Sequence, residues 1–132
     1  MIIFDTSVWI PFFNGTPLNQ TNLLKELITN RVRIAITDLI LTEILQGIRH
    51  PQQFEKTRNA LLQLDILHAI PIKTYIHAAE IYRTGREKGI TIRKTNDCII
   101  AAIAIENDCP LLHQDRDFDA MTNFCELKLY HH

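Results

Sequence analysis

Carboxylates that could share a metal ion are spread through the chain, at the expected ends of elements or on a helix beside the sheet: Asp5, Glu43, Asp97 and Asp115. Asp5 follows the apolar run 2–4, which is typical of a strand buried on both faces, and Asp115 follows a second short strand. Asp97 falls in the first turn of an expected helix, where the helix dipole favours negative charge. If the two strands are neighbours, these three acids meet in the crevice where open α/β sheets bind ligands.

The chemistry of such a group follows from its charge. Clustered carboxylates repel one another, which raises some of their pKa values unless a cation compensates. Oxygen ligands suit a hard ion, so we expect Mg²⁺ or Mn²⁺ rather than zinc. Cys98, Cys109 and Cys125 are odd in number and show no C-x-x-C spacing, which argues against a disulfide framework or a zinc site. A divalent ion held by carboxylates can assist the hydrolysis of a phosphate ester.

Each acid also has a purely structural interpretation. Asp5 can shape a turn or cap a helix, and Asp97 can stabilise the start of its helix through the helix dipole without any other role. Asp115 belongs to an acidic run with Asp117 and Asp119, and such runs are usually solvated turns. Glu43 lies off the centre of the apolar stripe of its helix, so geometry alone leaves open whether it borders the crevice or faces solvent.

Strands and helices alternate in the pattern that should position these acids. Strands are expected at residues 2–4, 32–36, 66–72, 110–113 and 127–130, the third of them interrupted by Pro71. Helices are expected from the residues after Asp5 as far as Pro11 and Asn14-Gly15, at 21–30, at 38–48, from 51 through 64, at 73–88 and from 95 through 105. Thr6, Ser7, Thr37 and Thr95 are expected helix caps. The alternation predicts a three-layer α/β/α fold with a central parallel sheet.

Length and composition limit the remaining options. The 132 residues predict one domain, 1–132, in which His131 and His132 are set aside as a suspected tag remnant. The apolar runs are too short to span a bilayer and the N-terminus lacks a basic signal-peptide head, so we expect a soluble cytoplasmic protein. A net charge of −1 gives no global nucleic-acid signature, so any such partner must be held locally.

Four segments resemble, in the same order, the motifs of PIN-domain ribonucleases, especially the VapC-type toxins of toxin–antitoxin pairs: 3–10 (IFDTSVWI), 42–47 (TEILQG), 95–102 (TNDCIIAA) and 111–118 (LLHQDRDF). Each motif is weak alone, but the four together are specific and cover most of the chain. The resemblance implies a PIN-like fold and an endoribonuclease that depends on Mg²⁺ or Mn²⁺ and leaves 5′-phosphate and 3′-hydroxyl ends. By motif match it also implies that Asp5, Glu43, Asp97 and Asp115 are the acidic quartet.

The residues around the quartet receive secondary expectations. Thr6, Ser7 and Thr95 are expected to cap helices first and to orient carboxylates second. Asp117 is expected to cap the turn before Phe118, with metal binding through water as the alternative. His113 replaces the threonine that many relatives carry and Asn96 is a second departure; for His113 a hydrogen-bonded role at the strand end is preferred over a phosphate contact.

A basic cluster lies just before Asp97, with a single acid, Glu87, among its members: Arg83, Arg86, Lys88, Arg93 and Lys94. It could hold an RNA backbone through Arg86, Arg93 and Lys94, or it could be a solvated helix end whose cations complement the dipole. The resemblance also implies a cognate antitoxin over the acidic crevice and a homodimer. Trp9, Phe12 and Phe13 could serve an interface, although core packing is the default for aromatic residues.

Two other classes of function remain open at this point. A non-catalytic binding module with the same fold is disfavoured by the intact quartet, and absence of divalent-metal binding would favour it. Another Mg²⁺-dependent phosphohydrolase is disfavoured because Ser7 stands where a dehalogenase-type phosphatase needs its second aspartate, and the chain has no glycine-rich nucleotide loop.

Overall fold

A four-stranded sheet forms the centre of the computed structural model, which describes residues 1–131. The strands are β1 (Ile2–Phe4), β2 (Ile34–Thr37), β3 (Asp65–Leu67) and β4 (Leu111–Leu112). All are parallel, in the order β3-β2-β1-β4, with Ile3 beside Ala35 on one side and Leu111 on the other. β1 is buried throughout, as its unbroken apolar run predicts. The condition on which the three acids were expected to meet, that the first and fourth strands are neighbours, is therefore fulfilled.

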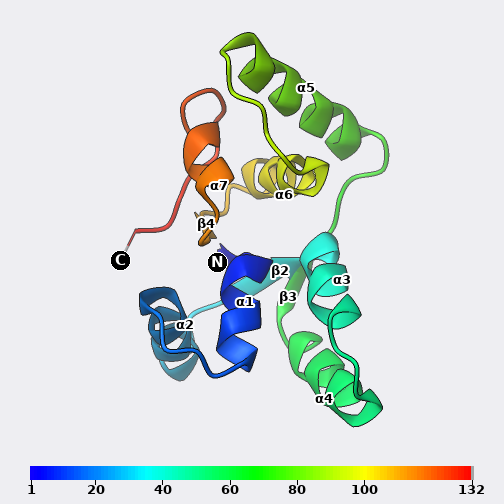
Figure 1. The fold of residues 1–132 in the computed structure, drawn as a ribbon, viewed down its shortest axis with the longest axis vertical. Helices are drawn as coiled ribbons and strands as arrows, with labels where there is room; N and C mark the ends of the chain where they lie inside the picture. The colour runs from blue at the N-terminus through cyan, green and yellow to red at the C-terminus, as the bar shows by residue number, and fades with distance from the viewer. Residues whose placement is uncertain (132) are drawn as a thin grey trace.

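Helices cover both faces of this sheet (Figure 1). They are α1 (Thr6–Phe13), α2 (Asn19–Thr29), α3 (Asp38–Gln46), α4 (Pro51–Leu61), α5 (Lys73–Glu87), α6 (Thr95–Glu106) and α7 (Arg116–Met121). Figure 1 shows α1 to α4 on one side of the strands and α5, α6 and α7 on the other. The three-layer α/β/α architecture with a central parallel sheet is confirmed.

Helix α6 is buried on nearly all sides. Every residue from Asp97 to Ala104 is buried, which fits a helix whose apolar residues surround its axis rather than forming one stripe. Figure 1 shows α6 between α5 and the sheet. Helix α5 also packs closely against Phe124, in the segment after α7, because an added Cβ at Gly85 would lie 2.7 Å from Phe124 Cζ. Asp97 is therefore the one acid among the buried residues of α6, the most enclosed element of the fold.

Several element predictions are corrected. Pro11 does not limit α1, which runs through it to Phe13, because Trp9 stacks on Phe13 and packs edge-on against Phe12. Of the predicted strand 66–72, only residues 66 and 67 are in a strand, as part of β3. Residues 68–70 are irregular and a turn follows at Pro71. Of the predicted strand 127–130, only Leu129 pairs, through one bridge to Leu111.

Helix ends follow side-chain hydrogen bonds. Thr37 Oγ1 accepts from the Ile40 amide, so its predicted capping role is confirmed. Thr95 does not cap α6: it is the first helical residue, the cap position is Lys94, and no side-chain bond is made there. Within residues 1–131, no helix combines the length and apolarity that crossing a membrane requires.

Candidate metal centre

The acids lie where the order of strands reverses. The chain runs outward from β1 to β2 and β3, and β4 then pairs on the opposite side of β1. In open α/β sheets, this reversal leaves a crevice at the carboxyl ends of the two strands where the order reverses, here β1 and β4. Asp5 follows β1 and is the N-cap of α1, while Asp115 follows β4 and is the N-cap of α7. The sheet topology therefore brings together two acids 110 residues apart in sequence, as the strand-end argument predicts.

Asp5 is held rigidly by its neighbours. Its Oδ2 accepts hydrogen bonds from the Ser7 amide (3.0 Å) and the Ser7 hydroxyl (2.7 Å), and only 5% of the residue is exposed. The Ser7 oxygen in turn accepts from the Gln114 amide (2.9 Å), which ties the loop after β4 to the start of α1. The cap of α1 is therefore Asp5, and the first expected role of Ser7, capping, is wrong; Ser7 has its second expected role and orients the carboxylate.

Asp97 has the most perturbed environment in the cluster. It is 4% exposed, and its Oδ2 is buried without a hydrogen-bond partner. Burial raises the pKa of Asp97 to about 7, with further increases from the charges of Asp5, Asp115 and Glu43 and an opposing effect of Lys94. A buried carboxylate among other acids favours either a proton or a cation at its oxygen. The interpretation of Asp97 as a simple helix-start residue does not account for this arrangement.

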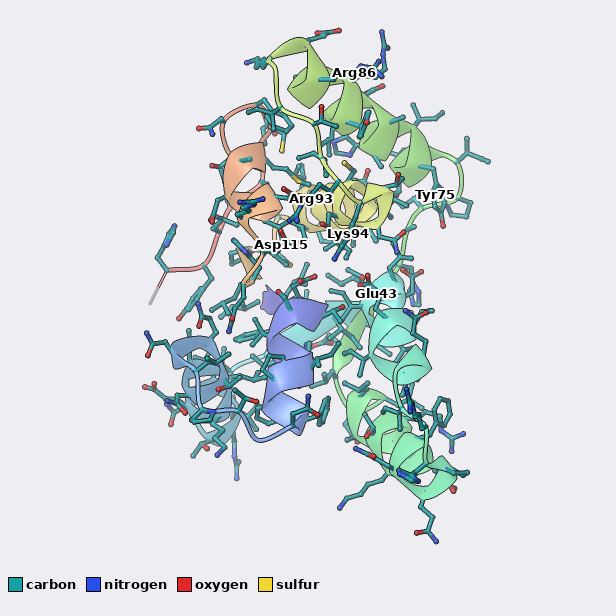
Figure 2. The ribbon with its side chains drawn as sticks, in the orientation of Figure 1. Glu43, Tyr75, Arg86, Arg93, Lys94 and Asp115 are labelled. Carbon is teal, nitrogen blue, oxygen red and sulfur yellow. The ribbon has the colours of Figure 1, made fainter. Side chains whose placement is uncertain are left out.

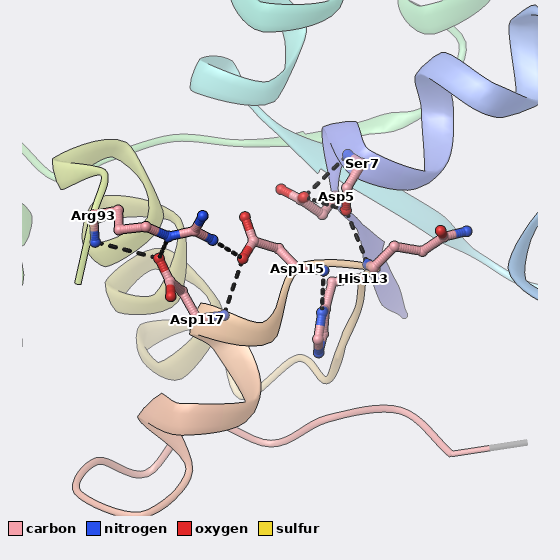
Figure 3. A network of polar contacts seen from close by, with 7 residues as sticks. Asp5, Ser7, Arg93, His113, Asp115 and Asp117 are labelled. Carbon is pink, nitrogen blue, oxygen red and sulfur yellow. Dashed lines mark hydrogen bonds and ion pairs between the residues drawn. The ribbon is translucent and has the colours of Figure 1, made fainter. Parts of the chain in front are cut away.

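Asp115 and Asp117 share an arginine (Figure 3). Arg93 Nη2 donates to Asp115 Oδ1 (3.2 Å), and both its Nε (3.1 Å) and its backbone amide (3.2 Å) donate to Asp117 Oδ2. Asp115 Oδ1 also caps α7 by accepting from the Asp117 amide. The predicted cap before Phe118 is therefore Asp115, and the prediction for Asp117 is wrong because its side chain binds Arg93. Since Asp117 is a buried residue of α7, the acidic run is not a fully solvated turn.

The fourth acid reaches the site from α3. Thr6 donates its hydroxyl hydrogen to Glu43 Oε1 at 2.8 Å, so Thr6 orients a carboxylate instead of capping its helix. The charge of Glu43 contributes to the raised pKa of Asp97, which shows that the two groups face the same region. Figure 2 shows Glu43 on the side of α3 that faces Asp115. The structure therefore brings all four predicted acids to one edge of the sheet.

The predicted accessory residues divide into two groups. Arg93 and Lys94 lie beside the acids, whereas Arg86 stands at the far end of α5, over the Tyr82 ring (Figure 2). Thr95 is exposed and lines a shallow hollow between α5 and α6 with Tyr75 and Tyr82.

His113 has the structural role that the sequence favoured. Its Nδ1 accepts from the Asp115 amide (2.8 Å), and its Nε2 lies 3.2 Å from Asp119 Oδ1. These two contacts fix the ring at the strand end, where it supports the loop that carries Asp115.

The donor set fits a hard divalent ion. Among the described residues 1–131, one oxygen each from Asp97, Asp115 and Asp117 lie within 4.8 Å of one another. Oxygen-only donors of this kind suit Mg²⁺ or Mn²⁺. The orphaned Asp97 oxygen gives an independent reason to expect a cation. Asp117 is the member that sequence reasoning ranked lowest, and no sequence signal showed that Arg93 would engage it.

Comparison with known proteins agrees with this geometry. The PIN domain family matches residues 2–123. The VapC ribonuclease Mb1587 of Mycobacterium bovis and ribonuclease VapC11 of Mycobacterium tuberculosis are each 35% identical, over 97% of this chain and 96% of their own length. Among solved structures, VapBC2 from Rickettsia felis, bound to a DNA fragment from its promoter, aligns with a TM-score of 0.75 at 24% identity over 98% of both chains. DNA-bound VapBC from Salmonella typhimurium aligns with a TM-score of 0.74 at 18% identity, again over 98% of both chains. With the acids in this arrangement and the match extending over nearly the whole sequence, the chain belongs to the PIN-domain family and, within it, to the VapC ribonucleases.

Proposed function

We propose that the chain is an endoribonuclease toxin of a toxin–antitoxin pair, and that it hydrolyses RNA phosphodiester bonds with Mg²⁺ or Mn²⁺. The observation that carries this proposal is the buried Asp97 oxygen, which has no partner and faces the charges of Asp5 and Asp115. Such a carboxylate is costly in an apolar environment unless a cation occupies the space before it. Membership of the VapC ribonucleases supports RNA as the substrate.

The four acids have different tasks in this mechanism. Asp97 and Asp115 would hold the ion together with Asp5, and Glu43 would complete the site or orient water. Asp117, the third acid of the close group, would stay paired with Arg93. When bound, the ion polarises a phosphoryl oxygen and lowers the pKa of a water. Asp97 must release its proton for the site to be fully charged, and its pKa of about 7 places that release near neutral pH. Thr6 and Ser7 then hold Glu43 and Asp5 in fixed orientations.

The basic residues beside the acids would hold the RNA. Lys94 is exposed at the start of α6 and electrostatically coupled to Asp97, so a phosphate can bind there without losing contact with the site. Arg93 has 55% of its side chain exposed while it holds Asp115 and Asp117. Contact by Arg86 stays a prediction, and it would involve RNA remote from the acids. Replacing Lys94 should lower the slope of affinity against salt concentration.

An antitoxin and a second copy of the chain are the proposed protein partners. Solved VapBC complexes share this fold, which supports an antitoxin as the regulator. The predicted homodimer stays a proposal, for which sedimentation is the direct test. Trp9 is not available to such an interface because it is 2% exposed and packs on Phe4 and Phe13, whereas Phe12 and Phe13 are half-buried.

The proposal is tested by RNA cleavage with and without chelator, for wild type, Asp5→Asn and Asp97→Asn. Asparagine also caps helices, so Asp5→Asn should keep α1 folded while removing the charge. Asp108→Asn is the matched control, since Asp108 is an exposed aspartate that pairs with Lys128 outside the site. We expect cleavage by wild type and the control only, and only with metal. Equal cleavage by all four proteins would refute the assigned roles.

Two further measurements separate the alternatives. A general phosphatase substrate assayed beside RNA tests for a small-molecule phosphohydrolase, which would prefer that substrate. Titration with Mn²⁺ tests for a non-catalytic module, which would show no binding that depends on Asp97.

A further inference from the structure

A second hollow adjoins the acids and has a different lining. It has a volume of about 850 Å³ and lies between α2, the loop after β4, α7 and the C-terminal segment. This volume lies within the range of about 300–1,000 Å³ that is usual for small-molecule sites. We call it the amide groove, because side-chain amides of α2 and of the β4 loop line it: Asn19, Gln20, Asn22 and Gln114.

The groove and the metal centre share one loop. Gln114 and Arg116, which line the groove, are the immediate neighbours of Asp115 in the metal centre. The Gln114 amide donates to Ser7 Oγ, and that hydroxyl donates to Asp5 Oδ2. A ligand in the groove would therefore contact the loop that carries Asp115, and this loop is tied to Asp5 through Ser7. A nucleotide next to the cleaved bond would reach the groove directly.

The lining suits a base better than a phosphate. Side-chain amides pair with the donor and acceptor edges of bases, and Gln114 Nε2 already donates to Gln20 Oε1 (3.2 Å) across the groove. The carboxylate of Asp119, which also contacts His113, can accept hydrogen from base amino groups, and the Arg116 guanidinium of the same lining can attract the adjoining phosphate. Tyr130 adds a half-buried aromatic ring, the kind of side chain on which unpaired RNA bases stack.

From these observations we infer that the amide groove binds the base of the nucleotide flanking the cleaved bond, and that Gln20, Gln114 and Tyr130 determine which base is preferred. This inference rests on the proposed ribonuclease function and adds a position for sequence selection to it. In the free protein the side-chain amides of Gln20 and Gln114 are hydrogen-bonded to each other. A base that binds them must therefore replace this hydrogen bond with bonds to its own donors and acceptors.

The first test maps cleavage of an RNA library randomised around the cut. The variants are Gln20→Ala, Gln114→Ala and Tyr130→Leu, with Gln53→Ala and Tyr75→Leu as matched controls because both residues are exposed outside the groove. Preference at one flanking position should fall on the order of 10-fold in the groove variants, as expected for loss of specific base contacts. Preference elsewhere, and in both controls, should match wild type. Groove variants with the wild-type preference profile would overturn the inference.

A binding measurement keeps the test independent of catalysis. Short oligoribonucleotides that differ at one base are titrated into Asp97→Asn, and into the same protein carrying Gln114→Ala. Discrimination among the four bases should exist in the first protein and collapse in the second; equal discrimination in both would overturn the inference. If wild type fails to cut RNA but this discrimination is found, the nuclease proposal fails while the base site stands. If the groove variants lose only inhibition by an antitoxin, the groove binds protein and the inference is wrong.

Discussion

Asparagine at position 97 should stabilise the metal-free protein more at pH 8 than at pH 5. The pKa of Asp97 is about 7 in the folded protein, against an ordinary value of 3.8. The folded state therefore binds a proton more tightly than the unfolded chain, and stability falls as pH rises between these two values. Each pKa unit is worth about 1.4 kcal/mol, which sets a ceiling of about 4 kcal/mol, and more than half of this falls between pH 5 and pH 8.

Urea unfolding in the presence of chelator measures this effect. Wild type and Asp97→Asn are each unfolded at pH 5 and pH 8. The free energy of unfolding that the variant gains over wild type at pH 5 is then subtracted from the gain at pH 8. Groups that titrate in both proteins cancel in this difference, which should reach at most about 3 kcal/mol. Glu126→Gln removes an exposed carboxylate outside the site and should show almost no difference. An equal effect of Asp97→Asn at the two pH values would refute the reasoning.

Other perturbations test single contacts. Mn²⁺ at about 100 times its dissociation constant should stabilise wild type by about 2.7 kcal/mol at pH 8 and leave Asp97→Asn unchanged in thermal unfolding. Arg93→Gln should lower kcat/KM for RNA on the order of 10-fold through its lost charged hydrogen bonds, and Arg93→Lys should restore only part because lysine lacks the planar fork. Thr6→Val should cost about 1 kcal/mol in chemical unfolding, whereas Thr6→Ser should retain the bond to the α3 carboxylate. Gly85→Ala should destabilise by about 1–3 kcal/mol, while Gly47→Ala, whose Cβ would meet only a carbonyl oxygen at 3.7 Å, should be close to neutral.

Hydrophobic patterns predicted the layers and the parallel sheet, although not the order of its strands, because burial acts on short runs of sequence. The β1 run is apolar at every position, and the Thr37 cap stands directly before a helical period. Helix α7 was missed because its first turn is acidic and reads as a solvated turn. Its stability comes from the Asp115 cap and from burial of Phe118 and Met121, which no local propensity describes.

Contacts between distant segments explain the remaining errors at the site. Arg93 pairs with acids 22 and 24 residues further along the chain, and no periodic pattern encodes such a spacing. Glu43 was ambiguous on its helix because its orientation depends on Thr6, which belongs to another element. The motif match supplied Glu43 where helix geometry alone did not, and it gave nothing for Arg93.

The enclosure of α6 has a consequence for how the enzyme can be switched off. Because α6 is packed between α5 and the sheet, moving it would expose much of the buried apolar surface. A regulator that displaced Asp97 would have to unfold the protein around it. Inhibition by a partner must therefore work through occlusion, by filling the mouth of the crevice or supplying a competing cation, while the interior stays as it is.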